Sequence, residues 1–437
     1  YIYGEVIDMI KKNINMESKI TVVDSVMGSG KTSWAIKFIN ELPEVIKIIY
    51  VTPFLSEVDR VIKSTCDRKF YEPNERNNKG TKLNGFKELL KKGLNIVTTH
   101  SLLKLVDDEV LELIKKDNYI LIQDECMEVI ERIEVNKLDL QLLLDSQFIT
   151  LEDNNYLKWT GPLDYNGIFK EVKINCTNGA LYRYKDSNTL ICLFRRDIFD
   201  IFKNVFILTY MFDGQQQKYY FDLMRIQYAV KSVRKIDGEY QLINYFDQGG
   251  AQFRNLIDIY KGQLNRIGGK KYSLSSTNLK GMDKDKAKEV RNMMYNYFHN
   301  IVKGKSSYNM WTTIKAAETL LKGAGYSKGF IACNSRATNE FSEKRNLAYI
   351  LNRFINPIEK NFFNDNGIEF DEDKFALAEM LQWIFRSAIR KGEEINIYIP
   401  SKRMRRLLEG WLNDVEYNIM LEEMDELDAA IELQDVL

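Results

Sequence analysis

The first half of the chain alternates short apolar runs with segments whose apolar residues recur at helical spacing. The apolar runs are residues 20–24, 47–52, 95–99, 119–123 and 205–208. The helical segments are residues 4–14, 31–41, 55–64 and 85–92. Continuous apolar runs are typical of strands buried on both faces, and their alternation with helices predicts a parallel sheet. We therefore predict an α/β domain over residues 1–225.

Residues 148–193 break this pattern. Polar and apolar residues alternate there, with many aromatic side chains such as Phe148, Tyr156 and Trp159. Alternation with a period of two is typical of half-buried antiparallel strands. The segment is thus predicted to be a small β-rich insertion into the first domain.

A second series of strands and helices follows residue 225. The predicted strands are residues 240–245, 271–274, 328–333 and 395–399. The predicted helices are residues 251–265, 283–302, 340–356 and 373–390. This order predicts a second α/β domain over residues 226–410. Beyond it, apolar residues at 420, 424, 427 and 431 predict an amphipathic helix over 418–433, within an acidic tail of residues 411–437.

The charge is unevenly distributed. The 437 residues hold 62 Lys and Arg against 62 Asp and Glu, so the net charge is zero. The tail contains nine acids and no Lys or Arg, which leaves residues 1–410 with a net charge of +9. A basic body suits a protein that binds nucleic acid through a local channel. The tail is expected either to pack on the second domain, to compete with DNA for this body, or to dock a protein partner through its methionines.

Composition excludes several other classes of protein. The five cysteines form no C-x-x-C pair and only two histidines occur, which argues against a disulfide scaffold, a zinc ribbon or a histidine-rich metal centre. No apolar run approaches the length of a membrane span, and no signal peptide is visible. We expect a cytoplasmic protein with no membrane partner.

The strongest chemical signal is the segment Ser25-Val26-Met27-Gly28-Ser29-Gly30-Lys31-Thr32, between a predicted strand and a predicted helix. Glycines allow the main chain to approach a phosphate, and the N-terminus of the helix favours the anion. We expect ATP phosphates to bind the loop, with Lys31 reaching the β- and γ-phosphates and Thr32 binding Mg²⁺. The expected ATP-binding residues are Gly28, Ser29, Gly30, Lys31, Thr32 and Ser33.

A second signal is the apolar run that ends in Gln123-Asp124-Glu125. Ligands of parallel sheets bind at the carboxyl ends of the strands, where this run delivers two adjacent carboxylates. We predict that Asp124 belongs to the Mg²⁺ shell and that Glu125 deprotonates the attacking water. By itself a strand that ends in two acids also fits an exposed strand end, and the phosphate loop upstream favours the catalytic interpretation.

A third signal lies in the second domain, where Gln382, Arg386 and Arg390 recur at a spacing of four residues. This spacing predicts that they share one face of a helix. An amphipathic surface helix would show the same pattern. Together with a phosphate loop, the arginines are predicted to stabilise the transition state of phosphoryl transfer, and all three residues are candidates for catalysis.

On these motifs the chain resembles a superfamily 2 helicase of the DEAD/DEAH-like kind. The phosphate loop resembles motif I, Asp124-Glu125 resembles motif II and the stretch 382–390 resembles motif VI. Stretches 311–313, 334–339 and 398–405 further resemble helicases encoded by phages and prophages of Gram-positive bacteria. The resemblance implies an α/β fold of two RecA-like parallel-sheet lobes. It departs at Leu208-Thr209-Tyr210-Met211, where motif III normally reads Ser/Thr-Ala-Thr.

The resemblance also implies where nucleic acid binds, because in this family a single strand crosses both lobes and is held through its phosphates. Hydroxyl groups and N–H groups at strand ends suit such contacts, although the same threonines could simply cap turns. Trp311 could stack on a base or belong to the core. The matching positions are Thr52, Pro53, Thr98, Thr99, His100, Thr312, Thr313, Arg336 and Thr338.

Three functions fit these features. The first is an ATP-dependent DNA helicase or translocase of phage replication or recombination, acting on single-stranded or forked DNA, with RNA also possible. The second is a nucleic-acid-stimulated ATPase that remodels protein–DNA complexes or loads another factor, such as a replication or recombination protein bound by the tail. The third is a P-loop kinase, which leaves the second domain and its arginines unexplained.

Overall fold

The computed structural model describes residues 18–413 except 54, 66–67, 75–79, 154, 186–188 and 334–340. Contacts divide the described chain into two compact units. Unit 1 runs to Asp24, from Gly30 to Asn244 and from Asn356 to Phe370. Unit 2 holds Ser25–Ser29, Tyr245–Ile355 and the chain from Asp371 onward. Predictions for residues 4–14 and 418–433 lie outside the described residues.

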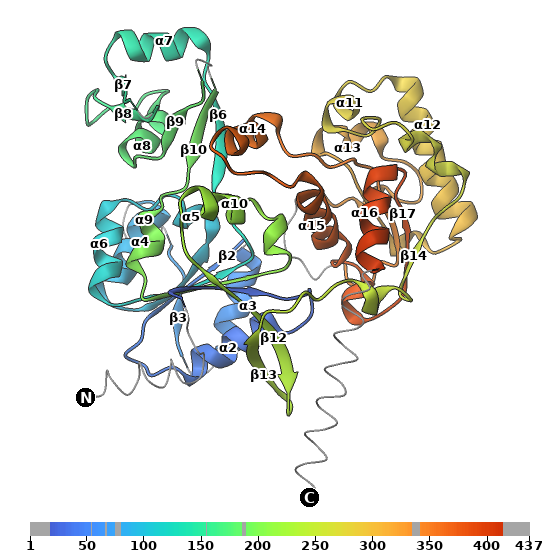
Figure 1. Cartoon of the computed structure of the whole chain (residues 1–437), viewed down its shortest axis with the longest axis horizontal. Coiled ribbons are helices and arrows are strands. Elements are labelled where there is room, and N and C mark those ends of the chain that lie inside the picture. The colour runs from blue at the N-terminus through green and yellow to red at the C-terminus, as the bar shows by residue number, and fades with distance from the viewer. Residues whose placement is uncertain are drawn as a thin grey trace, which may run out of the picture. The chain divides into compact units, whose positions relative to one another are not determined.

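A mostly parallel sheet forms the centre of unit 1, in the order β13-β12-β1-β11-β5-β2-β4-β3 (Figure 1). Its central strands are buried on both faces, as continuous apolar runs require. The strands are β1 (Ile20–Asp24), β2 (Ile48–Thr52), β3 (Phe70–Tyr71), β4 (Asn95–Thr99), β5 (Ile120–Asp124), β11 (Asn204–Thr209), β12 (Ala229–Ile236) and β13 (Glu239–Asn244). The five strands predicted in the first half of the chain are confirmed.

The strand predicted at residues 240–245 exists as β13, but it lies in unit 1. It pairs antiparallel with β12 at the edge of the sheet. Asp237 and Gly238 join the two strands and both have positive φ, at 52° and 82°. Asp-Gly is the dipeptide that a two-residue hairpin turn of this kind favours, so the sequence does carry a signal for the hairpin.

Helices of unit 1 connect the strands and cover the sheet. Trp34 and Phe38 of α2 pack with Phe206 of β11 in one core cluster, with ring centroids 5.0–5.5 Å apart. The helices are α2 (Lys31–Glu41), α3 (Leu55–Ser64), α4 (Lys82–Lys91), α5 (His100–Leu103), α6 (Asp108–Lys116), α9 (Asp197–Ile201) and α10 (Gln216–Leu223).

The insertion is confirmed as a small antiparallel element, and it is larger than predicted. It begins at residue 130, and β6 and β10 run side by side away from the main sheet (Figure 1). It has its own core, in which Trp159 packs with Phe148 and Tyr165. Its elements are β6 (Ile130–Glu134), α7 (Lys137–Asp145), β7 (Ile149–Leu151), β8 (Leu157–Trp159), α8 (Lys170–Thr177), β9 (Leu181–Arg183) and β10 (Thr189–Leu193).

A segment from late in the chain also belongs to unit 1. Helix α14 (Pro357–Asp365) contacts both the insertion and α10. Its Phe362 ring lies 5.4 Å from the ring of Tyr182, and Glu359 accepts a hydrogen bond of 2.7 Å from Gln216. Residues 356–370 therefore tie the insertion to the helix that follows β11.

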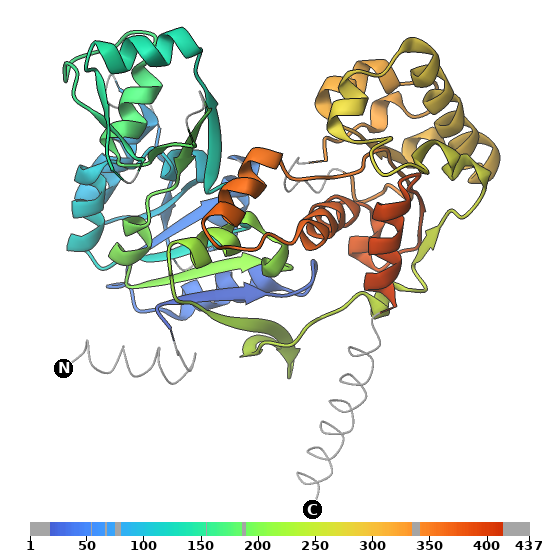
Figure 2. The same cartoon turned by 45° about the horizontal axis from the view of Figure 1, so that its top comes forward.

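Unit 2 is built on a parallel sheet in the order β14-β17-β16-β15. Figure 2 shows α15 and α16 side by side in this unit. The strands are β14 (Ile257–Ile259), β15 (Asn309–Thr312), β16 (Asn346–Tyr349) and β17 (Ile395–Tyr398). The longer helices are α12 (Lys284–Asn296), α15 (Glu372–Ile384) and α16 (Lys402–Leu412).

Several predictions for unit 2 are wrong. Residues 251–265 form β14 and two 3-10 turns rather than a helix, because Ile257 and Ile259 are buried while Asp258 between them is exposed. The segment 340–356, predicted as a helix, contains strand β16. All residues of β16 are buried, so the spacing of apolar residues there does not distinguish a strand from a helix. Residues 271–274 form turns, and 328–333 contribute one bridge, at Phe330.

Candidate functional site

The predicted phosphate loop connects β1 to α2. Gly28 and Gly30 have φ of 88° and 96°, in the region that favours glycine. A Cβ on Gly30 would lie 2.0 Å from the ring of Tyr240, so only glycine fits there. Helix α2 begins at Lys31 with no acid in its first turn, which leaves its N-terminal N–H groups and dipole suited to an anion.

The start of the loop is held by a glutamine that sequence reasoning missed. The side-chain oxygen of Gln248 accepts a 2.8 Å hydrogen bond from the N–H of Val26, and its amide lies 3.4 Å from the hydroxyl of Ser25. Both Ser25 and Gln248 are buried. Ser25, which departs from the usual opening residue of such loops, thus has a hydrogen-bonding role here. No local pattern points to Gln248, because it lies more than 200 positions away in the chain.

Asp24, the last residue of β1, is a second residue that the sequence analysis did not single out. Its carboxylate accepts hydrogen bonds from the N–H groups of Met211 (2.9 Å) and Phe212 (2.8 Å). Burial raises the pKa of Asp24 to about 6, an effect opposed by these two bonds and by the charge of Lys31. The carboxylate therefore links the start of the phosphate loop to the turn after β11.

This raised pKa makes stability depend on pH. Between about pH 4 and pH 6 folded Asp24 keeps a proton that the unfolded chain has lost, so its contribution to stability falls as the pH rises. Over this rise of the pKa from 3.8 to about 6, the contribution of Asp24 to the free energy of unfolding changes by about 3 kcal/mol, at 1.36 kcal/mol per pKa unit. We expect Asp24→Asn to lack this fall, so the free energy of unfolding should shift in favour of the variant between about pH 4 and pH 7. Denaturant unfolding of both proteins measures it, and parallel pH profiles would contradict the assignment.

Asp124 ends β5, two strands from β1 in the same sheet. Its carboxylate accepts a 3.0 Å hydrogen bond from the hydroxyl of Tyr50, and the guanidinium of Arg60 lies 3.9 Å away. Burial raises the pKa of Asp124, and the charges of Arg60 and Lys31 oppose this shift. The charge of Lys31 thus lowers the pKa of the carboxyls that end both β1 and β5.

Glu125 follows in a left-handed backbone conformation with φ of 64°, which is uncommon for a residue other than glycine. Its N–H donates to the carbonyl of Leu208 on β11, at 2.9 Å. Non-glycine residues in this region persist where their surroundings hold them, and they concentrate at functional sites.

A buried glutamine on α10 holds the rest of this loop. The side-chain oxygen of Gln217 accepts hydrogen bonds from the amide of Gln123 (2.7 Å) and from the N–H of Met127 (3.1 Å). Gln123 also donates to the carbonyl of Glu125, at 3.0 Å. The loop with the two acids is therefore fixed to α10 and to β11, which carries the segment that departs from motif III.

The three residues predicted to share a helix face in the second domain do not do so. Helix α15 ends at Ile384, so only Gln382 lies on it. Arg386 follows the helix and is buried, whereas Arg390 is exposed in a 3-10 turn, Ala388–Lys391. The carbonyl oxygen of Arg390 lies 3.8 Å from the point where a Cβ on Gly28 would stand, and both residues are grouped in unit 2.

The nucleic-acid positions predicted in unit 1 gather at the carboxyl ends of two paired strands. Thr52 of β2 pairs with Thr99 of β4, with Pro53 and His100 directly after them. Thr52, Thr98 and His100 are buried, while Pro53 and Thr99 are partly exposed. The Nε2 atom of His100 lies 2.9 Å from the carbonyl oxygen of Asp124, so this histidine connects the strand ends to the acidic pair.

The positions predicted in unit 2 are less accessible. Thr312 and Thr313 follow Trp311 at the end of β15, and all three are fully buried. The Trp311 ring packs edge-on against Tyr326 and Phe330, so it is a core residue. The remaining two positions, Arg336 and Thr338, lie outside the described residues.

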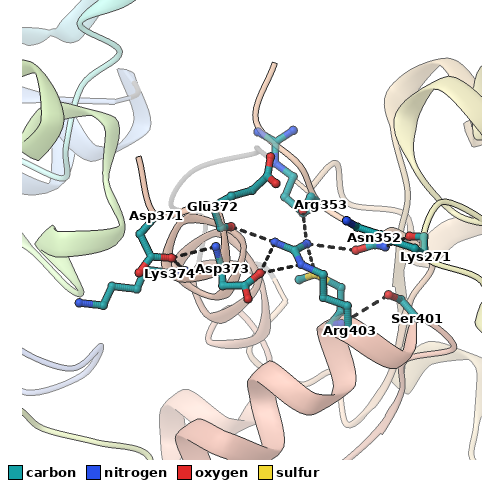
Figure 3. Close-up of polar contacts among 10 residues, drawn as sticks. Lys271, Asn352, Arg353, Asp371, Glu372, Asp373, Lys374, Ser401 and Arg403 are labelled. Atoms are coloured by element: carbon teal, nitrogen blue, oxygen red, sulfur yellow. Dashed lines mark hydrogen bonds and ion pairs between the residues drawn. The ribbon is translucent and has the colours of Figure 1, made fainter. Parts of the chain in front are cut away.

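Helix α16 begins with the basic residues Lys402, Arg403, Arg405 and Arg406, of which Arg403 has a structural role (Figure 3). Arg403 donates to Asp373 (2.7 Å), to the carbonyl of Arg353 (2.7 Å) and to the carbonyl of Glu372 (3.0 Å). Its guanidinium also lies over the ring of Phe354, 4.6 Å from the centroid. These contacts fasten α16 to the start of α15 and to the segment after β16.

Three regions of the chain match models of known families. Residues 4–145 match the Type III restriction enzyme, res subunit; residues 130–192 match the YonV middle domain; residues 251–412 match the YonV C-terminal Rossmann-like domain. The chain is also 42% identical over 411 residues to the SPbeta prophage-derived uncharacterized protein YonV of Bacillus subtilis (strain 168). That match covers 91% of this chain and 99% of the relative. The chain belongs to the YonV family.

Two solved structures are similar over most of the chain. S. tokodaii Xpd4 has a TM-score of 0.46 at 12% identity, covering 92% of this chain and 95% of that one. The DUF1998 helicase MrfA bound to DNA and AMPPNP has a TM-score of 0.34 at 12% identity, covering 93% of this chain and 49% of that one.

The YonV family models agree with the divisions seen in the structure. The middle-domain match begins at residue 130, where β6 opens the insertion, and the Rossmann-like match covers the strands of unit 2. The res-subunit match contains the phosphate loop and the acidic pair. The resemblance to phage-associated superfamily 2 helicases is confirmed, as is the α/β architecture with parallel sheets.

No helix in the described part of the chain combines the length and apolar character needed to cross a bilayer. In the same part of the chain, His, Cys, Asp and Glu side chains do not gather in groups of three or more that could hold a metal ion.

Proposed function

We propose that this YonV-family chain is an ATP-dependent DNA helicase or translocase, which couples hydrolysis of Mg²⁺-ATP to movement on single-stranded DNA. One arrangement carries the proposal. A loop with two left-handed glycines heads α2, and the acidic pair Asp124-Glu125 ends a parallel strand of the same sheet. The match of residues 4–145 to the Type III restriction enzyme, res subunit, supports the same function.

The residues of the loop fit ATP and Mg²⁺. The backbone at Gly28, Ser29 and Gly30 would wrap the β-phosphate, and the first turn of α2, with Lys31, Thr32 and Ser33, would add N–H groups and one cation. Thr32 and Asp124 would hold Mg²⁺, which supplies charge neutralisation at the phosphates. The charge of Lys31 already acts on the carboxyls of Asp24 and Asp124 at this edge of the sheet, which agrees with that role.

In hydrolysis Glu125 would orient the attacking water and accept its proton. Arg386 and Arg390 would stabilise the charge that develops on the γ-phosphate, and Gln382, on the last turn of α15, is a further candidate for this step. The hydrogen bonds that the acidic loop donates to Leu208 and Gln217 give a route by which hydrolysis could act on β11 and α10.

DNA would pass the strand ends at Thr52, Pro53, Thr98, Thr99 and His100, and in unit 2 it would contact Arg336 and Thr338. Thr312 and Thr313 are fully buried, so we expect no direct contact with them. Pro53 and Thr99 are the partly exposed members of the first group, so we expect direct contacts there. The prophage relative supports a role in phage replication or recombination in the cytoplasm of the host.

ATPase assays with and without single-stranded DNA or RNA test this function, together with unwinding of forked substrates carrying 3′ or 5′ tails. We expect DNA to stimulate hydrolysis severalfold and forked DNA to be separated. Stimulation without strand separation would favour a remodelling ATPase. Hydrolysis that responds to neither nucleic acid would overturn the proposal and favour a P-loop kinase.

A further inference from the structure

A groove runs between the insertion and the strand ends of unit 1. Two adjoining cavities, of about 980 and 700 Å³, share the side chains of Ser101, Leu105, Lys170, Ile174 and Asn178. Helix α8 forms one wall of both, and it lies on the side of the insertion that faces α5 (Figure 1). The larger cavity also reaches Pro53 and Thr99, at the ends of β2 and β4.

The two cavities differ in charge. In the smaller cavity positive and negative charges are balanced, because Lys104 pairs with Glu128 and Glu131, and Arg195 pairs with Asp108. The larger one is lined by three lysines, Lys82, Lys170 and Lys173, and by one acid. That acid, Asp107, is already paired with Lys87 at 2.5 Å. The larger cavity therefore presents an excess of positive charge, which suits an anionic occupant.

The floor of the larger cavity is apolar. Leu55, Leu105 and Ile174 are 50%, 50% and 37% exposed, and all three line this one cavity, where grouped apolar side chains mark a binding surface. Hydroxyl and amide groups of Thr81, Ser101, Thr177 and Asn178 lie around them. An apolar floor with a cationic and polar rim matches a single strand, because its unstacked bases offer apolar faces and its backbone offers phosphates.

We propose that α8 of the insertion is the second wall of a groove that binds single-stranded nucleic acid, opposite Pro53 and Thr99. The inference rests on the proposed function and adds a contact that the helicase motifs do not include. The phosphates lie against Lys82 and Lys170, and the bases lie over Leu105 and Ile174. Lys173 instead donates to the carbonyls of Leu163 and Tyr165, which fixes the loop before α8.

Charge reversal on α8 tests the proposal, with a fluorescent oligothymidylate as the probe. We expect Lys170→Glu to weaken its binding by about fivefold or more and to reduce the slope of log K against log salt by about 1. The matched control is Lys158→Glu, an exposed residue of β8 that lines neither cavity, which should change neither quantity. Thermal unfolding of both variants shows whether the insertion still folds.

Photo-crosslinking gives a second readout that does not depend on charge. Benzoylphenylalanine placed at position 174 should crosslink to the bound strand, whereas the same residue at position 138 should not. Leu138 is 78% exposed on α7 and lies outside both cavities.

The outcomes separate the two levels of the argument. If the wild-type protein binds no oligothymidylate, the proposed function itself fails. If it binds, but Lys170→Glu behaves like Lys158→Glu and position 174 gives no crosslink, the groove holds something else and this inference alone is wrong.

Discussion

Glu125→Gln is expected to keep ATP binding and to lower the rate constant of hydrolysis by at least a hundredfold. A general base of this kind typically contributes between a hundredfold and ten-thousandfold, and the amide cannot accept the proton of the attacking water. Glutamine has nearly the same size as glutamate. The hydrogen bond from the N–H of residue 125 to the carbonyl of Leu208 should therefore persist, as should the left-handed backbone at this position. Single-turnover hydrolysis and equilibrium binding of a fluorescent ATP analogue measure the two quantities separately.

The same substitution three positions later provides the control. Glu128 is exposed and pairs with Lys104, so Glu128→Gln should leave hydrolysis unchanged. Lys31→Ala should differ from both, because it removes the cation at the γ-phosphate and so weakens binding as well as turnover. Hydrolysis by Glu125→Gln at the wild-type rate would show that another group activates the water.

The strands around the phosphate loop could be predicted because they are buried on both faces. β1, β2, β4 and β5 are continuous apolar runs that end in polar residues, and the structure bounds each within one residue of the prediction. The loop itself was visible because a left-handed turn in front of a helix favours glycine at positions 28 and 30. Local chemistry determines both features.

Unit 2 shows where local patterns stop being informative. The helix predicted through residue 390 ends at Ile384, although residues 373–391 contain no glycine or proline. Two hydrogen bonds account for the end. The hydroxyl of Ser387 donates a hydrogen bond to the carbonyl of Ile384 (2.7 Å), and the N–H of Ala388 donates one to the carbonyl of Lys344 (2.9 Å). The second partner is distant in sequence, so no periodicity could reveal it.

The candidate site follows the same rule. Sequence alone singled out the loop and the acidic pair, but it missed the residues that hold them. Asp24 accepts a hydrogen bond from Met211, which lies 187 positions away in the chain. Gln217 accepts one from Met127, which lies 90 positions away. Such contacts depend on the order of strands in the sheet, which places β11 between β1 and β5. Single-sequence patterns carry no information on that order.

The second large effect is expected at the arginines of unit 2. Arg390→Ala should leave ATP affinity within severalfold and lower kcat by at least tenfold, because losing an arginine that stabilises the transition state typically costs much more than that. Arg390 is exposed, so its loss should not disturb folding. Arg386 is 6% exposed, so Arg386→Ala is expected to lower the melting temperature as well as kcat.

The neighbouring lysine separates a catalytic role from a general loss of charge. Lys391 lies in the same 3-10 turn and pairs with Glu343, so Lys391→Ala removes a positive charge from the same turn. We expect it to retain wild-type kcat, whereas Arg390→Lys should recover only part of the activity, because an ammonium cannot make the two parallel hydrogen bonds of a guanidinium. Steady-state kinetics give kcat and KM, and nucleotide binding is measured directly. Full turnover by Arg390→Ala, or an equal loss in Lys391→Ala, would mean that Arg390 acts only through surface charge or not at all.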